Sequence, residues 1–327
     1  MDVAATAGAG VRALVAMLLL ASPAAAQTHV LVACGLGGEP RYQEAFLAAG
    51  LAIADAAQGR LGIPASRIRL LAEDPSRHPR VAARSTKEEI TRSLAVLASD
   101  AQPDATILIV FVGHGSVGPE GARINLPGPD LSAKDFAALL GPFGTRRIVV
   151  VNAASASGDW VREVGGPGRV VLTATRSGAE REETQFGGYF AAALASEEAD
   201  HDKDGRLSVL EVFEYARREV VRLYERDQRL RTEHPLLDAD GDGVGTMEPV
   251  ETEGDGAAAA TFYLGNGPAG APLTGLAAVR DSLEREVARL RGRKAAMEPA
   301  AYDRQLETLL VELARVTREL RTQEGRR

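Results

Sequence analysis

Two short polar stretches follow apolar runs of the sequence, and both carry residues that could take part in catalysis. His114 and Gly115 directly follow the apolar run 105–113, and Ser155 follows the run 147–152 after two alanines. Histidine is the usual general base near neutral pH, and a serine hydroxyl becomes a nucleophile when a neighbouring base removes its proton. The backbone N–H of a glycine can stabilise an oxyanion. Together these residue types predict covalent catalysis if the two stretches meet in the fold.

The two apolar runs belong to a longer alternation of strand-like and helix-like patterns. Strands are expected at 29–34, 67–72, 105–113, 147–152 and 169–175, with helices between them and a last edge strand at 261–265. Continuous apolar strands that alternate with helices predict an α/β fold, a mostly parallel sheet with helices on both faces. Sites in such sheets lie at the carboxyl ends of the strands. His114 and Ser155 should therefore be neighbours at that edge.

A second group of residues fits calcium rather than catalysis. The stretch 200–211 follows the EF-hand pattern, in which a glycine at position six, here Gly205, allows a sharp turn. The expected ligands are the side chains of Asp200, Asp202, Asp204, Ser208 and Glu211 and the backbone carbonyl of Arg206. Calcium prefers six to eight oxygen ligands, and this set supplies them. The alternative is an acidic surface turn.

A weaker copy of the same pattern occupies 238–249. Its matching residues are Asp238, Asp240, Asp242 and Gly243. Position twelve is Pro249, so the usual bidentate carboxylate is missing, and Glu248 or Glu251 would have to replace it. Two such loops around one helix favour a structural role for calcium over a sensing role.

The stretches around His114 and Ser155 resemble the clan CD cysteine peptidases, which include the legumain family and the caspases. In that clan one strand ends in His-Gly and the next in Ala-Cys-x-Ser-Gly. "IVFVGHGS" (109–116) is similar to the first block and "VVVNAASASG" (149–158) to the second. The resemblance covers about 29–264 and is greatest to bacterial legumain-family members.

This resemblance implies a caspase-like fold, a peptide or protein as substrate or ligand, and catalytic roles for His114, Gly115 and residue 155. It also implies that the stretch 172–190 forms part of the first specificity pocket, with Arg176 and Glu183 nearby.

The sequence departs from the clan at the nucleophile, because Ser155 stands where the clan has cysteine. Cys34 is the only cysteine, and it is expected on the first strand, far from the edge that carries Ser155. A hydroxyl is far less acidic than a thiol and needs a base that is oriented by a third group. Neither Asp159 nor Glu120 has a spacing that identifies that group.

We therefore expect a peptidase homologue with weak or no activity. Two alternatives stay open: an active hydrolase that uses Ser155 with His114, and a calcium-stabilised scaffold that acts through its C-terminal helices.

The two ends of the chain differ from this central part. Residues 1–26 combine Arg12, a short apolar run and a small-residue end, which predicts a secretory signal peptide cut before Gln27 and export to the periplasm or beyond. No transmembrane span is expected after its removal. A net charge of −7 argues against a nucleic-acid partner.

The predicted domain organisation places a caspase-like domain at 27–264, with the calcium loops in an insertion at about 197–252. A Gly/Pro linker at 265–275 follows. Apolar residues then recur at four-three spacing through 276–324, with a break at Pro299, which predicts a helical hairpin or coiled coil. The hairpin could pack on itself or the main domain, or join a partner or a second copy.

Overall fold

The computed structural model describes residues 27–144, 146–265, several positions between 275 and 290, and 297–324. The predicted signal peptide, most of the linker and much of the first tail helix lie outside the described residues. Within the part that is described, no helix has the length and apolar character needed to cross a bilayer.

Seven strands form the central sheet, in the order β11-β9-β8-β4-β1-β2-β3. Their bounds are β1 Thr28–Cys34, β2 Ile68–Ala72, β3 Val81–Arg84, β4 Thr106–Val112, β8 Arg147–Asn152, β9 Arg169–Thr173 and β11 Leu236–Asp238. Only β11 is antiparallel to its neighbour. Every residue of β1 and β4 is buried, as expected for parallel strands that helices cover on both sides. The predicted fold class is confirmed.

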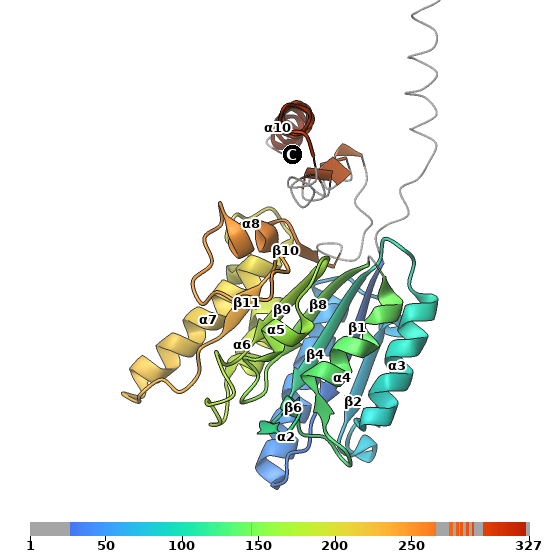
Figure 1. Ribbon diagram of the computed structural model, residues 1–327, viewed down its shortest axis with the longest axis vertical. Helices are drawn as coiled ribbons and strands as arrows, with labels where there is room; N and C mark the ends of the chain where they lie inside the picture. The colour runs from blue at the N-terminus through green and yellow to red at the C-terminus, as the bar shows by residue number, and fades with distance from the viewer. Residues whose placement is uncertain are drawn as a thin grey trace, which may run out of the picture.

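Helices cover both faces of this sheet (Figure 1). One face carries α2 Pro40–Gly59, α6 Phe186–Ala195 and α7 Val209–Arg226, and the other carries α3 Lys87–Asp100, α4 Ala133–Leu139 and α5 Trp160–Val164. Successive residues of β4 point to opposite faces, so that Val110 joins the first core and Phe111 the second. Phe111 makes edge contacts with Phe136 and Trp160. Two apolar cores therefore hold the sheet rigid from either side.

Smaller elements surround the sheet. Strands β5 Gly115–Gly118, β6 Gly121–Ile124 and β7 Leu131–Ser132 form a separate antiparallel sheet directly after His114. The expected strand at 261–265 is present as β12 Tyr263–Leu264, but it pairs with β10 Leu207–Ser208 and not with the main sheet. Helix α8 spans Gly254–Ala260, and four short 3₁₀ helices span Ala65–Arg67 (η1), Pro75–Arg77 (η2), Gly141–Phe143 (η3) and Glu197–Ala199 (η4).

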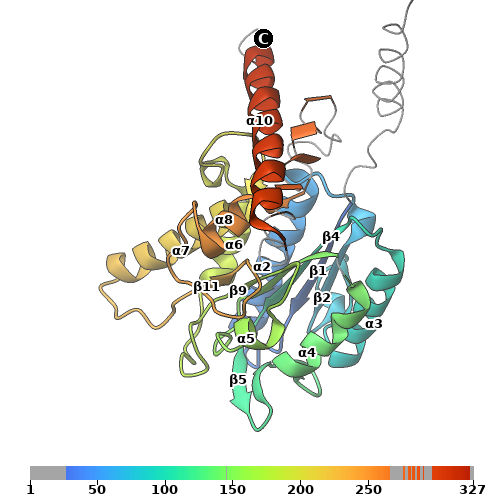
Figure 2. The same ribbon diagram turned by 45° about the horizontal axis from the view of Figure 1, so that its top comes forward.

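The C-terminal helix α10 spans Pro299–Glu324 and projects from the body of the molecule (Figure 2). Tyr302 and Val316 of its four-three pattern are buried, as are Val287 and Leu290 of the preceding segment. The second helix of the predicted hairpin is therefore present. Where the first is described, Arg280 approaches Asp204 of the first acidic loop at 3.4 Å.

Candidate functional site

His114 and Ser155 leave adjacent strands at the same edge of the sheet. Strands β4 and β8 pair in parallel up to Phe111 and Asn152, so the residues that follow them emerge side by side. The Gly115 N–H donates to the Ser155 hydroxyl at 3.1 Å, and that hydroxyl donates to the Gly115 carbonyl at 3.2 Å. The structure thus brings together the two stretches that the sequence predicts to meet.

His114 is held by aromatic contacts. Its half-buried ring packs edge-on against Tyr42 and Phe46 of α2, with ring centroids 4.5 and 4.9 Å apart. Burial lowers the pKa of His114, although the charges of Glu183 and Glu39 oppose the shift. The imidazole is therefore neutral at pH 7, the form that a general base requires. Within the described residues, however, no hydrogen bond joins His114 to Ser155.

The backbone around Ser155 allows very little freedom. A Cβ added to Gly115 would lie 2.2 Å from the Ser155 carbonyl oxygen, so only glycine fits beside it. Ala156, the next residue, has a φ of 53°, a conformation that non-glycine residues rarely adopt. Ser155 itself is 3% exposed. Its hydroxyl is therefore fixed against Gly115 rather than free to turn toward a substrate.

Residues 175–186, which we call the wall segment, pack against the loop 153–159 that carries Ser155. The Ala156 N–H donates to the Glu180 carbonyl at 2.7 Å, and the Thr184 hydroxyl donates to the Ala153 carbonyl at 2.6 Å. The Thr175 hydroxyl oxygen accepts from the N–H groups of Ser157 and Gly158 at 2.8 and 3.0 Å. The wall segment therefore fixes the position of the Ser155 loop.

The two predicted pocket residues lie in this wall segment but differ in their surroundings. Arg176 is exposed, and its guanidinium pairs with the Glu180 carboxylate at 3.0 Å. Glu183 is also exposed, and its charge acts on His114. Neither Asp159 nor Glu120 makes a described hydrogen bond to the His114 ring. Glu183 is therefore better placed than Arg176 to influence a ligand at His114.

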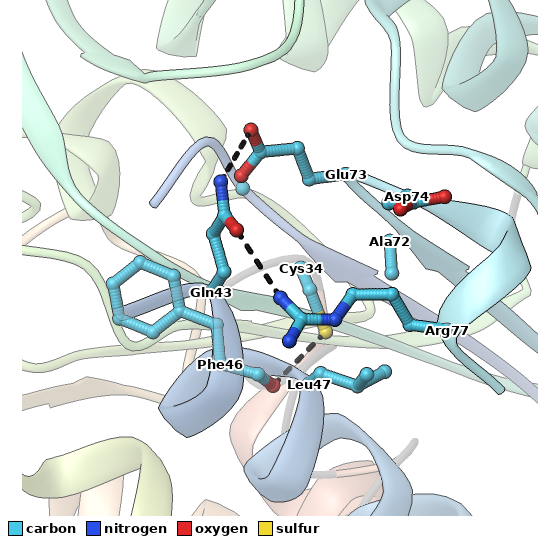
Figure 3. A pocket seen from close by; sticks show the side chains of 9 residues that line it. Cys34, Gln43, Phe46, Leu47, Ala72, Glu73, Asp74 and Arg77 are labelled. Carbon is cyan, nitrogen blue, oxygen red and sulfur yellow. Dashed lines mark hydrogen bonds between the residues drawn. The ribbon is translucent and has the colours of Figure 1, made fainter. Parts of the chain in front are cut away.

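A small open pocket lies beside the His114 site, at the carboxyl ends of β1 and β2 (Figure 3). Arg77 crosses it and donates to Gln43 at 3.2 Å, while Glu73 accepts from Gln43 at 3.1 Å. Phe46, which contacts His114, also lines the pocket. The pocket and the His114 ring therefore share one aromatic side chain.

Cys34 also lines this pocket, and its location corrects the expectation that it lies far from the edge. It is the last residue of β1 and pairs with Val112 of β4. Burial raises the pKa of its thiol to about 12, and the thiol donates to the Phe46 carbonyl at 3.1 Å. Because a thiol must lose its proton to become a nucleophile, Cys34 cannot replace the missing catalytic cysteine.

The first acidic loop has the oxygen-rich character that a hard cation requires. Asp200, Asp202 and Asp204 each place a carboxylate oxygen within 4.8 Å of the others, and Gly205 has a φ of 79°. Glu211 accepts from the His201 N–H at 2.8 Å and so reaches back across the loop. Burial raises the pKa of both Asp202 and Glu211, and the charge of Asp204 adds to the shift at Asp202. A bound cation would relieve this crowding of charge.

The side chains of Ser208 and Arg206 make contacts of their own within this loop. The Ser208 hydroxyl caps α7, because it accepts from the Glu211 N–H at 3.2 Å and donates to the Glu211 carboxylate at 2.8 Å. The Arg206 guanidinium is buried, donates to Asp204 at 2.8 and 2.9 Å, and stacks on Tyr263. Arginine therefore already neutralises part of the charge of Asp204.

The second acidic loop is completed by a residue that the sequence pattern does not identify. Asp238, Asp240 and Asp242 converge as in the first loop. Asp255, in the first turn of α8, accepts from the N–H groups of Ala239 and Asp240 at 2.7 and 3.3 Å. These are the second and third positions of the loop, the same positions that Glu211 contacts in the first loop. Asp255 is therefore the counterpart of Glu211.

This finding corrects the expectation that Glu248 or Glu251 would supply the missing carboxylate. Both are exposed, and the only described ion pair of either is a 3.9 Å contact between Glu248 and Arg217. Burial, with the charge of Asp255 adding to it, raises the pKa of Asp238 to about 6. Among the described residues, no arginine or lysine pairs with the four carboxylates of this loop. The second loop is thus less neutralised than the first.

Comparisons with known proteins give no family assignment. No family model matches the sequence, and no curated protein matches it. Among solved structures, the protein GSU0716 of Geobacter sulfurreducens is similar at 11% sequence identity with a TM-score of 0.41. That match covers 64% of this chain and 92% of the other. A likeness at this level says nothing about activity.

The contacts of the site also include residues that no sequence motif identifies. Tyr42 and Phe46 hold His114, and Glu233 holds the far end of the wall segment. All three are distant in sequence from the residues that they contact. A buried acidic residue such as Glu233 has no recognisable spacing, so only the three-dimensional structure locates it.

Proposed function

We propose that the protein is an exported peptidase homologue of the legumain type, which binds an extended peptide at the His114–Ser155 edge and cleaves it weakly or not at all. One observation carries this proposal. The Ser155 hydroxyl hydrogen bonds to Gly115 in both directions, while the His114 ring packs against Tyr42 and Phe46.

The chemistry of serine explains why this arrangement favours binding over hydrolysis. A serine hydroxyl needs a base within about 2.6–3.2 Å, and that base is usually oriented by a carboxylate. Here the hydroxyl proton is directed to the Gly115 carbonyl, and Glu183 affects His114 through its charge alone. The neutral imidazole has the correct protonation state but no hydroxyl to activate. A peptide could still use the polar groups along the edge.

Peptide binding to the full chain tests this function. Fluorescent peptides with Asn, Asp, Arg or Lys before the expected cleavage point should bind without being cut. Because Glu183 lies near His114, Glu183→Gln should weaken binding of the Arg and Lys peptides about fivefold, the size of a single partly screened charge contact. The matched control is Glu182→Gln, an exposed neighbour with the same change of charge. Efficient cleavage by the wild type that disappears in both Ser155→Ala and His114→Ala would instead establish a serine hydrolase.

We also propose that calcium binds the two acidic loops and stabilises the domain. The converging carboxylates and the positive φ of Gly205 and Gly243 support this role. Residues that would hold the ion are Asp200, Asp202, Asp204 and Glu211 in the first loop, and Asp238, Asp240, Asp242 and Asp255 in the second. Carboxylate oxygens are the ligands that calcium prefers.

Asp255 gives the sharpest test of the second loop. In a chain whose first loop carries Asp200→Ala and Glu211→Gln, Asp255→Asn should weaken calcium binding about tenfold or more, because ligand charge sets the affinity of such loops. Isothermal titration calorimetry measures the change. Glu251→Gln is the matched control and should leave the affinity unchanged. Weakening by Glu251→Gln and not by Asp255→Asn would show that our ligand assignment is wrong.

A further inference from the structure

The peptide unit that joins Ser155 to Ala156 is held in an unusual conformation by contacts on both sides. Ala156 has a φ of 53°, which a non-glycine residue adopts only where the surrounding structure holds it there. The Ala156 N–H donates to the Glu180 carbonyl at 2.7 Å, and the Ser155 hydroxyl bonds to Gly115. The position of the Glu180 carbonyl therefore helps to fix where the chain turns after Ser155.

The side chain of Glu180 holds that carbonyl in place, because its carboxylate is bonded to two separate parts of the chain. One oxygen accepts from the backbone N–H groups of Arg176 and His234 at 3.0 and 3.2 Å. The other oxygen lies 3.0 Å from the Arg176 guanidinium and 2.6 Å from Nδ1 of His234. The carboxylate thus ties the start of the wall segment to the chain between α7 and β11.

The chemistry of these contacts suits a carboxylate and not an amide. The Glu180 side chain is 10% exposed, so little water is at hand to replace a lost partner. The backbone N–H groups and the guanidinium that contact it can only donate, and an ionised carboxylate accepts at both oxygens. Hydrogen bonds to a charged acceptor are also stronger than those to a neutral one. An amide at position 180 would instead turn an NH₂ group toward some of these donors.

We propose that Glu180 is a positioning residue for residue 155: its carboxylate holds the wall segment so that its own carbonyl keeps the Ser155 hydroxyl closed against Gly115 rather than turned to His114. This inference rests on the proposed function only in taking the His114–Ser155 edge as the binding site. It adds that the closed position of Ser155 depends on the side chain of a residue outside the His114–Ser155 edge.

Alkylation of a thiol at position 155 tests the proposal without requiring a ligand or any activity. In the full chain with Ser155→Cys the new thiol occupies a buried position, so iodoacetamide reaches it only when the loop opens. Adding Glu180→Gln, which keeps the size of the side chain, should raise the labelling rate about tenfold, because the lost bonds involve a charged acceptor. Cys34 is buried in the core, should stay unlabelled and serves as the internal reference.

A matched variant and a second measurement separate positioning from general stability. Glu182→Gln removes the same charge from an exposed neighbour and should leave the labelling rate unchanged. Hydrogen exchange of the chain with the native Ser155 then follows the Ala156 amide directly. Glu180→Gln should lower the protection of this amide about tenfold, whereas the amides of β4 in the core should keep theirs. A residue that only stabilised the whole fold would lower protection equally in both places.

The possible outcomes separate this inference from the proposed function. Equal labelling of the Glu180→Gln and Glu182→Gln chains, or protection that falls equally at Ala156 and in β4, would overturn the inference. If Glu180→Gln does not fold, His234→Ala removes one side-chain contact of the carboxylate and should raise labelling about threefold, and an unchanged rate would then overturn it. Faster labelling confined to position 155 supports the inference even when no peptide binds, a result that would count against the proposed function alone.

Discussion

Calcium at about 100 times its dissociation constant should raise the melting temperature by about 5–10 °C for each occupied loop. At that ratio a ligand that binds only the folded state stabilises it by about 2.7 kcal/mol. For a domain of roughly 150–250 residues, 1 kcal/mol corresponds to about 2–4 °C. The physical source of the effect is the relief of repulsion among the converging carboxylates of each loop. Differential scanning fluorimetry with calcium or with a chelator measures the shift.

Paired variants separate the contributions of the two loops. Asp200→Ala with Glu211→Gln should remove the shift due to the first loop, and Asp238→Ala with Asp255→Asn that due to the second. Glu248→Gln with Glu251→Gln removes two exposed negative charges nearby and should leave the full shift. If a chelator leaves the wild-type melting curve unmoved, both loops are only acidic turns.

The two loops should not contribute equally. Asp204 of the first loop already accepts from Arg206 and Arg280, so calcium must compete with two guanidinium groups for that carboxylate. The second loop has no described ion pair with arginine or lysine, and Asp255 bonds to its backbone beside the three converging carboxylates of Asp238, Asp240 and Asp242. At one calcium concentration we therefore expect the larger shift from the second loop, although the sequence pattern there is the weaker of the two.

The fold and the meeting of the two stretches that carry His114 and Ser155 could be predicted from the sequence, because both depend on local patterns. Continuous apolar strands between amphipathic helices predict a parallel sheet, and parallel strands place their following loops at one edge. The register of β4 with β8 then brings Gly115 against Ser155.

The remaining features of the site depend on contacts between segments that are far apart in sequence. Tyr42 reaches His114 from α2, and Glu233 reaches Phe186 from beyond α7. Asp255 lies six residues beyond the twelfth position of its loop, so a pattern with fixed spacing cannot include it. Similarly, the position of Cys34 at the edge follows from the exact end of β1, and strand ends are poorly fixed by composition.

Replacing Ser155 by cysteine should produce peptidase activity well above that of the wild type. Burial at position 155 will raise the pKa of a thiol above the ordinary value of about 8.5, but a thiol stays far more acidic than a serine hydroxyl and its sulfur is the better nucleophile. A thiol is also a weak hydrogen-bond donor, so Ser155→Cys loses little when the side chain leaves the Gly115 carbonyl. The Gly115 N–H lies 3.1 Å from the present hydroxyl and remains close to any oxyanion that forms there.

If His114 acts as the general base for Cys at position 155, removing its imidazole should lower the cleavage rate. General acid–base catalysis contributes about 10²–10⁴ in rate, so adding His114→Ala to Ser155→Cys should lower cleavage at least about 100-fold. Ser157→Cys is the matched control, because it places a thiol in the same loop but against Thr175, where Ser157 is 1% exposed, and it should be inactive. The assay uses peptides with Asn, Asp, Arg or Lys before the cut, in calcium. A folded Ser155→Cys chain that binds these peptides but does not cleave them would contradict the prediction. That result would show that His114, packed against Tyr42 and Phe46, cannot act as a base for residue 155 even when the nucleophile is a thiol.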